Sequence, residues 1–148
     1  YGGKITTYRH LAEEAVDILA ARLPALSGPA WTRTRPLPGG DFPVDGGAAM
    51  QRDLMRAHPF LSETEAARIQ QAYGTRAEVW LGEARRREDL GRDFGAGLSE
   101  AEVDYLCQYE WAVTADDVLW RRSKLGLRMN AAEVAVLADY LARPRPVM

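Results

Sequence analysis

The sequence is poor in the residues that build metal sites and disulfides. It contains one cysteine, Cys107, and two histidines, His10 and His58, among 148 residues. A single cysteine excludes an internal disulfide and is compatible with a reducing compartment. The spacing of these three residues matches no zinc-site pattern. We therefore predict neither a metal site nor a disulfide-stabilised fold.

Long apolar runs and an excess of charge of one sign are also missing. No apolar run approaches the roughly 20 residues that a membrane-spanning helix needs. The formal net charge is −2. A protein that holds nucleic acid through its phosphates presents a basic surface, so this balance disfavours a nucleic-acid binder, including a helix-turn-helix domain. With 47% hydrophobic and 27% charged residues, the chain has the composition of a globular domain with a core.

The alternation of apolar and polar residues that is typical of strands is nearly absent. Apolar residues instead recur at helical spacing, for example at Leu11, Ala15, Ile18 and Leu19. We expect helices that begin near residues 7, 48, 62, 75, 99, 114 and 130. The fold class that follows is all-α, a compact bundle of about six or seven helices.

Most of these expected starts carry a capping signal, in which a short polar side chain precedes a Glu by three residues. Thr7 is a candidate N-cap without that Glu, and Thr114 with Asp117 is a variant of the same device. The full signals are Ser62 with Glu65, Thr75 with Glu78, Ser99 with Glu102, and Asn130 with Glu133.

One stretch, residues 24–47, interrupts the helical pattern after the first helix. It holds five of the eight prolines and five of the thirteen glycines, so it cannot form a regular helix. Its bulky residues favour an ordered crossing that packs on the rest of the protein. These residues are Leu26, Trp31, Leu37, Phe42 and Val44. A second irregular stretch follows at 89–97.

Few side chains elsewhere indicate chemistry. Glu102 and Glu110 lie on or beside one expected helix, and paired carboxylates can do acid–base work, but their spacing fits capping and surface pairing equally well. Asp117 and Arg121 are four apart and can pair, while Val118 and Leu119 face the core. An anion site at Arg121 and Arg122 is the lesser alternative. We expect core packing from the tryptophans, Trp31, Trp80, Trp111 and Trp120.

The opening segment, YGGKITTYR, has the features of an anion or cofactor contact. The glycine pair allows a ligand close to the backbone, and the start of the next helix presents free amides and partial positive charge. Lys4 adds a full charge. The segment is not a Walker loop, because the upstream glycine and the following Ser or Thr of that motif are lacking. A glycine turn that leads into a capped helix, with a solvated lysine, is the simpler explanation from physics alone.

These residues also resemble a known family. The opening is similar to the GGK-[IL]-TTYR segment of FAD-dependent, aerobic glycerol-3-phosphate dehydrogenases and glycerophosphate oxidases. The resemblance continues in register along essentially the whole chain. It is carried by Pro29–Thr32, Leu37–Gly40, Pro59–Leu61, Tyr73–Gly74, Asp89–Gly95, Glu102, Tyr105–Leu106, Glu110–Trp111 and Asp116–Arg122.

The resemblance implies the position of this chain within a longer enzyme. In that family the FAD-binding portion, with its GxGxxG fingerprint, lies before this point, and no GxGxxG occurs here. We therefore expect residues 1–6 to be the trailing loop of an FAD-binding domain and residues 7–148 to form the C-terminal helical domain. The parent would bind FAD, whereas the isolated chain would bind no cofactor and be inactive.

The resemblance also implies roles for single residues. Gly3, Thr6 and Thr7 are expected to contact the FAD of the full-length protein, and Lys4 is the candidate contact to the substrate phosphate. No catalytic residue is expected in this chain.

The implied parent oxidises sn-glycerol 3-phosphate to dihydroxyacetone phosphate and passes electrons through FAD to quinone. Its expected partners are its own N-terminal FAD domain, the substrate and the quinone, with no nucleic acid. We expect a cytoplasmic location, with the parent peripheral on the inner membrane face. Oxygen as acceptor, and the roles of this domain in dimerisation and membrane contact, stay open. The alternative is a free-standing helical interaction module without flavin chemistry.

Overall fold

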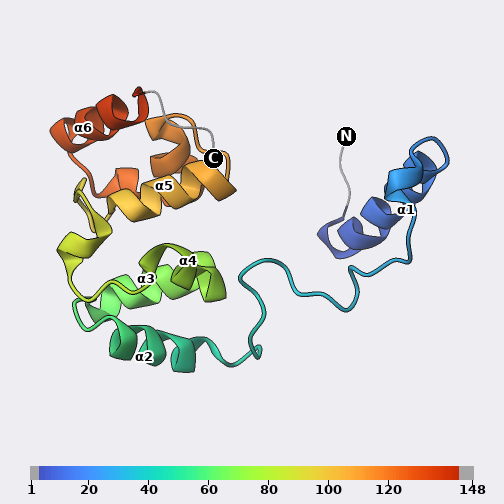
Figure 1. The fold of residues 1–148 in the computed structure, drawn as a ribbon, viewed down its shortest axis with the longest axis horizontal. Coiled ribbons are helices and arrows are strands. Elements are labelled where there is room, and N and C mark those ends of the chain that lie inside the picture. Colours follow the sequence, from blue (N-terminus) through green and yellow to red (C-terminus); the bar gives the residue numbers. More distant parts are fainter. Residues whose placement is uncertain (1–3, 144–148) are drawn as a thin grey trace. The chain divides into compact units, whose positions relative to one another are not determined.

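The structure, a computed structural model, describes residues 4–143 and confirms the all-α class. Its helices are α1 (Tyr8–Ala20), α2 (Gly47–Ala57), α3 (Glu63–Tyr73), α4 (Ala77–Leu81), α5 (Glu100–Tyr109) and α6 (Ala131–Leu141). Asp117–Arg122 forms a π-helical segment, and short 3-10 turns join these elements (Figure 1). Within the described range there is no strand, only an isolated bridge between Asp93 and Ser99. The expected helix starts all lie close to observed ones.

Contacts divide the chain into two units, with the division between Leu37 and Pro38. The first unit contains α1 and the 3-10 turn Pro24–Leu26, and the second contains α2 to α6. The expected boundary of the parent's domains, between residues 6 and 7, concerns a longer protein and stays a prediction.

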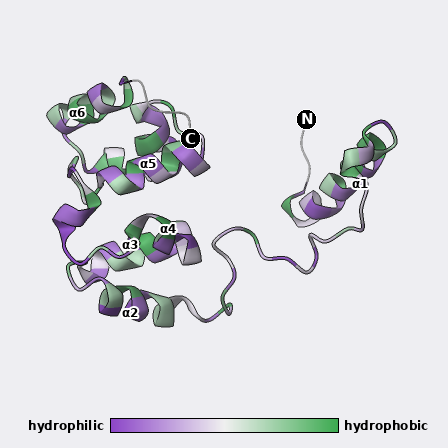
Figure 2. Cartoon of the chain, viewed as in Figure 1, coloured by the Kyte–Doolittle hydropathy of each residue, from purple (hydrophilic) through white to green (hydrophobic). Residues whose placement is uncertain are grey.

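The first unit has no buried residue between Lys4 and Leu37. Hydrophobic and hydrophilic residues alternate around α1 (Figure 2), and its apolar side chains are exposed. The Glu13 carboxylate accepts hydrogen bonds from Arg9, at 3.2 Å, and from the Thr32 hydroxyl. These polar contacts hold the segment after α1 against the helix without covering its apolar face.

The second unit has a continuous hydrophobic core. Its most deeply buried large side chains are Ile69, Leu81, Phe94, Leu98, Val103, Leu106, Val118, Leu119 and Leu137. They come from α3, α4, α5, α6, the π-helical segment and the loop before α5. The expected inward orientation of Val118 and Leu119 is confirmed.

Only some of the predicted capping boxes form. Ser62 and Asn130 form complete capping boxes, and Thr114 exchanges hydrogen bonds with Asp117. The prediction at Thr75 is wrong, because α4 begins at Ala77 and the Thr75 hydroxyl bonds to Asp41. At Ser99 only half of the box forms: the hydroxyl caps the Glu102 amide, but the Glu102 side chain points elsewhere.

Two packing expectations are wrong. In the crossing, the side chains of Leu26, Trp31, Leu37 and Val44 are exposed, and Phe42 alone of that set is half-buried. Of the four tryptophans only Trp80 is buried; Trp31, Trp111 and Trp120 are exposed. Apolar residue type predicts burial only where a covering surface exists within the same chain.

Candidate functional site

The segment that sequence analysis assigned to the cofactor and substrate begins outside the described residues, since Gly3 is not among them. Lys4 and Thr6 are exposed, and Ile5–Thr7 forms a 3-10 turn before α1. Thr7 occupies the N-cap position of α1, but its hydroxyl donates to the Lys4 carbonyl, at 3.0 Å, instead of capping the helix. The first turn of α1 therefore has no side-chain cap.

A close contact between two glycines fixes the chain where it enters the second unit. The Thr75 amide donates to the Gly39 carbonyl at 3.1 Å. A β-carbon on Gly74 would lie 1.9 Å from that carbonyl oxygen, and one on Gly39 would lie 2.4 Å from the Tyr73 carbonyl oxygen. Both glycines also have positive φ. The backbones therefore approach closely only because neither residue has a side chain.

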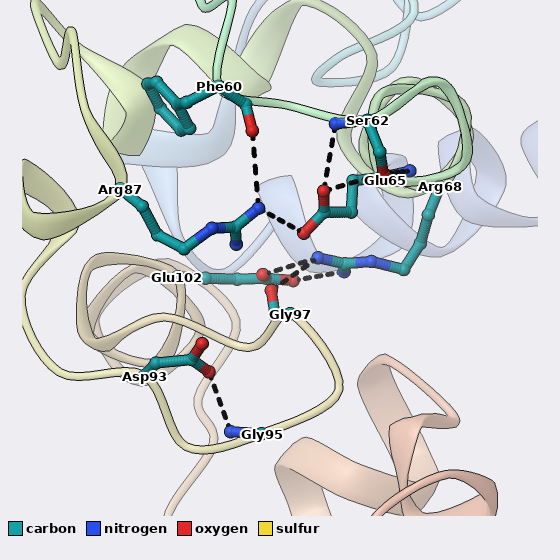
Figure 3. A network of polar contacts seen from close by, with 9 residues as sticks. All are labelled: Phe60, Ser62, Glu65, Arg68, Arg87, Asp93, Gly95, Gly97 and Glu102. Carbon is teal, nitrogen blue, oxygen red and sulfur yellow. Dashed lines mark hydrogen bonds and ion pairs between the residues drawn. The ribbon is translucent and has the colours of Figure 1, made fainter.

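The strongest polar cluster in the second unit joins α3 to α5 (Figure 3). Arg68 donates two hydrogen bonds to the Glu102 carboxylate, at 2.6 and 2.8 Å, and the Tyr73 hydroxyl donates a third at 2.6 Å. Glu102 is 0% exposed. A buried carboxylate requires such a partner, because an unpaired charge in the interior is costly. Both oxygens of this carboxylate accept hydrogen bonds. Glu102 is therefore a structural anchor in the interior, whereas its spacing in the sequence fits a residue that pairs at the surface.

The cluster shifts the ionisation of its members. Burial alone would lower the pKa of the Arg68 guanidinium, but the hydrogen bonds and charge of Glu102 outweigh it and raise that pKa. The pKa of the Tyr73 phenol is raised by burial and by the neighbouring Glu102. Both groups therefore keep one protonation state through the neutral range, and neither is suited to transfer a proton there.

A second ion pair, also in Figure 3, connects the start of α3 with the 3-10 turn Arg87–Leu90, which follows α4. Arg87 donates to Glu65 at 2.7 Å and to the Phe60 carbonyl at 3.4 Å. The same Glu65 accepts from the Ser62 amide in the capping box. Burial would raise the pKa of Glu65, but the Ser62 and Arg87 bonds outweigh it and lower that pKa. This pair has the function of a brace between α3 and the 87–90 turn.

A small pocket of about 210 Å³ lies beside α5, and its lining includes Arg76, Tyr105, Tyr109 and Glu110. The Arg76 Nε donates to the Tyr105 hydroxyl at 3.1 Å, and its guanidinium carbon lies 4.8 Å from the centre of the Tyr109 ring. Such a cation–π contact fixes the orientation of the guanidinium. Burial raises the pKa of the Glu110 carboxyl in the same pocket. The pocket thus presents a fixed donor next to a carboxyl.

A larger groove of about 430 Å³ lies along α2, between Phe42, Met50 and Gly74. Its lining includes the acidic residues Asp53 and Glu78, and the ring Nδ1 of its histidine, His58, is hydrogen-bonded to the Ala84 carbonyl at 2.9 Å. Two carboxylates repel an anion, so this groove does not fit a phosphate ester.

The predicted ion pair between Asp117 and Arg121 is confirmed. Arg121 donates to Asp117 at 2.8 Å. Hydrogen bonds from the Thr114 and Val113 amides, before the charge of Arg121, lower the pKa of Asp117 to about 2. Arg122 donates twice to the Glu110 carbonyl, at 3.0 and 2.7 Å. Both arginines are thus used within the domain.

Within residues 4–143, no three His, Cys, Asp or Glu side chains gather closely enough to hold a metal ion. None of the helices there combines the length and the apolarity that a bilayer crossing requires.

A comparison with known protein families shows to which family this chain belongs. Residues 30–143 match the family described as the C-terminal domain of alpha-glycerophosphate oxidase. The chain belongs to this family. The match covers the whole described part of the second unit, so the glycine contact, the Arg68–Glu102 pair and the Arg76 pocket all lie within the family domain.

Similar proteins support the resemblance seen in the motifs. Aerobic glycerol-3-phosphate dehydrogenase of Escherichia coli (strain K12) is 43% identical over 141 residues, 95% of this chain and 28% of that protein. Glycerol-3-phosphate dehydrogenase of Pseudomonas aeruginosa is 43% identical over 146 residues, 99% of the chain and 28% of that protein. D-erythritol 1-phosphate dehydrogenase of Brucella abortus is 38% identical over 140 residues, with 95% and 28% covered. The chain thus spans little more than a quarter of these relatives.

The structure brings together residues that sequence reasoning did not single out. Arg68 and Arg76 are unremarkable in the sequence, yet they bind Glu102 and Tyr105 across 34 and 29 residues. A charged residue at a core position of α5 was the available signal, because a buried Glu needs a cationic partner. No local pattern identifies which arginine supplies it.

Proposed function

We propose that this chain is the C-terminal helical domain of a longer flavoprotein that oxidises sn-glycerol 3-phosphate to dihydroxyacetone phosphate and passes electrons through FAD to quinone. The single observation that carries the proposal is the family match over residues 30–143. Relatives named as glycerol-3-phosphate dehydrogenases support it over the whole chain. The chain by itself serves as a structural domain and is inactive.

The start of α1 fits the expected flavin contact. Its first amides lack a side-chain cap, and Thr6 is exposed beside them. Such amides and the helix dipole favour partial negative charge in a bound group. Bound FAD would supply the hydride acceptor in the longer protein. The roles of Thr6 and Thr7 in this chain would be to position the cofactor edge, with Gly3 giving it backbone access.

Lys4 is the proposed substrate contact. Lys4 is exposed and takes part in none of the ion pairs described above. Its ammonium is thus available to a phosphate. A charge-assisted contact of this kind contributes about 1.5–3 kcal/mol. Glycerol 3-phosphate and erythritol 1-phosphate both carry a phosphate on a polyol, so this contact fits either. The relative that is named for the erythritol ester makes that ester the second substrate to test.

The test compares the 148-residue chain with the longer protein that contains it. The longer protein should copurify with FAD and reduce a quinone analogue with glycerol 3-phosphate, while the chain alone should contain no flavin and show no activity. Faster turnover on erythritol 1-phosphate would change the substrate but keep the reaction class. A longer protein without flavin would favour the helical interaction module instead.

The substrate role of Lys4 has its own variant. Lys4→Ala in the longer protein should lower kcat/KM for glycerol 3-phosphate roughly ten- to a hundredfold, since each 1.36 kcal/mol or so is tenfold. Glycerol, which has no phosphate, should show little difference between the two enzymes. Arg22→Ala, the loss of another exposed cation in the first unit, is the control and should leave both substrates unaffected. An equal loss on both substrates would show that Lys4 serves the flavin or the fold.

The remaining expectations are part of the same proposal. The parent's partners would be its own FAD domain, the substrate and quinone, and the parent would lie peripherally on the cytoplasmic face of the membrane. Vesicle flotation of the longer protein, with and without the present chain deleted, tests whether this domain takes part in the membrane contact.

A further inference from the structure

Trp111 has a backbone conformation that is unusual for a large residue. It follows the end of α5 with φ 57°, in the left-handed region. The amides of Glu110 and Ala112, on either side of it, both donate to the Leu106 carbonyl at 3.1 Å. This is the geometry of a helix C-terminus, where the left-handed position is usually occupied by glycine. A side chain with a β-carbon is strained there.

The strain is not repaid by packing within the described part of the second unit. The Trp111 side chain is 83% exposed. Two neighbours that alternate with it are exposed as well, Tyr109 at the end of α5 and Val113, which is 73% exposed. We call these three exposed residues, which lie within five positions of one another at the end of α5, the Trp111 patch. A large indole in a strained and exposed position is a feature that points to an external partner.

The Arg76 pocket adjoins the patch through Tyr109. The guanidinium of Arg76 is held over the Tyr109 ring, and the half-buried carboxyl of Glu110 lies in the same pocket. An oriented donor and an acceptor therefore lie beside Tyr109, one of the three residues of the patch. Apolar anchors with a few fixed polar groups are what protein interfaces place at their centres.

We propose that the Trp111 patch is the docking surface for the flavin-binding portion of the same polypeptide, a part of the protein outside this sequence. This inference rests on the proposed function. The chain covers 28% of its relatives, so most of such a protein is available to cover the patch. A covalently linked domain needs only a modest contact, because linkage raises its effective concentration.

Two other occupants fit less well. A stable dimer buries about 800 Å² on each partner, which is large for three side chains and a small pocket. An anionic lipid surface attracts clusters of basic residues, whereas none of the three patch residues is basic and Glu110, which precedes Trp111 in the sequence, is acidic. Both remain outcomes of the experiment.

The experiment replaces Trp111 by glycine in two proteins. In the 148-residue chain, Trp111→Gly should raise the melting temperature by about 2–4 °C, because glycine relieves the left-handed strain and no packing is lost. In the longer protein, calorimetry should show one transition for the wild type and two for the variant, since the helical domain no longer unfolds together with the flavin portion. Trp111→Asn should have the same two effects, because asparagine also tolerates the left-handed conformation.

The control is Leu127→Ala, at an apolar residue that is 77% exposed but outside the patch. It should change neither the melting temperature of the chain nor the single transition of the longer protein. A single, unshifted transition in the Trp111→Gly longer protein would overturn the inference. So would dimers of the wild-type chain, or its binding to phosphatidylserine vesicles, if Trp111→Gly abolished either. Missing flavin in the wild-type longer protein would instead contradict the proposed function, so the two failures are distinguishable.

Discussion

The two units of this chain use apolar residues in opposite ways. Residues 38–143 bury a continuous set of Leu, Val, Ile, Phe and Tyr side chains, and braces such as Arg68–Glu102 connect its helices. Residues 4–37 contain the equally amphipathic α1, yet none of their side chains is buried. The difference indicates that the second unit has a hydrophobic core of its own, whereas the first unit by itself leaves the apolar face of α1 uncovered.

The family match follows the same division. It begins at residue 30 and ends at 143, so it leaves α1 outside. The part of the chain that matches the family is thus also the part that has its own hydrophobic core. The opening segment and α1, which carry the expected cofactor and substrate contacts, belong to the unit that has no core of its own.

The largest expected effect concerns the glycine contact that begins the second unit. Gly74→Ala should cost more than about 4 kcal/mol of unfolding free energy, since its β-carbon would meet the Gly39 carbonyl oxygen at 1.9 Å. Gly82→Ala is a matched control, because Gly82 has nearly the same dihedral angles (φ 49°, ψ −131° against 52°, −132°) but open space around it. It should cost about 1–3 kcal/mol, the backbone strain alone. Equal losses in urea unfolding would show that the close approach is unimportant.

The next effect concerns the buried ion pair. Arg68→Ala should destabilise the second unit by about 3–5 kcal/mol, because it leaves the Glu102 carboxylate buried without its cation. Arg56→Ala removes an exposed arginine that pairs with Asp53 and should cost less than about 1 kcal/mol. Thermal unfolding followed by circular dichroism measures both. A similar small loss for Arg68→Ala would mean that solvent reaches Glu102.

A third pair of variants compares the units directly. Leu106→Ala, in the core, should cost about 2–5 kcal/mol in the 148-residue chain. Ile18→Ala in α1, where the side chain is 68% exposed, should change the unfolding free energy by less than about 0.5 kcal/mol. Chemical denaturation of both variants checks this. A large loss at Ile18 would mean that α1 already packs on a core in this chain.

The smallest effect is a pH dependence. The pKa of Asp117 is about 2 in the folded chain against an ordinary 3.8, so its ionised form is stabilised by folding. This contribution is present above about pH 4 and is lost as the pH falls toward about 2. Asp117→Asn should therefore lower the melting temperature at pH 7 and show a smaller decline than the wild type below pH 4. Parallel curves for the two proteins would contradict the assigned hydrogen bonds.

The sequence predicts the parts of this fold that depend on neighbours in the chain. The boxes at Ser62 and Asn130, the Thr114–Asp117 exchange and the Asp117–Arg121 pair all lie within four residues, so their partners are fixed by spacing. The resemblance to the family can be seen for the same reason, because its motifs are short runs of neighbouring residues. Neither needed a view of the tertiary fold.

The errors concern contacts between distant residues. The Ser99 box fails because Arg68, 34 residues before Glu102, offers that carboxylate a stronger charged partner than a backbone amide. The Thr75 box fails because Asp41 binds the Thr75 hydroxyl and α4 starts later. Trp31 and Trp111 were expected in the core, but no surface of their own unit covers them. The roles of Lys4, Thr6 and Thr7 stay predictions.

The most direct test of this account is amide hydrogen exchange of α1 in two proteins. The account states that residues 38–143 have their own hydrophobic core in this chain, while the first unit by itself leaves the apolar face of α1 uncovered, to be packed within the longer protein that we propose. In the 148-residue chain, the amides of α1 should exchange far faster than those of α5, whose side chains pack in the core. In the longer protein, α1 should gain protection comparable to that of α5. Equal protection of α1 in both proteins would contradict the account.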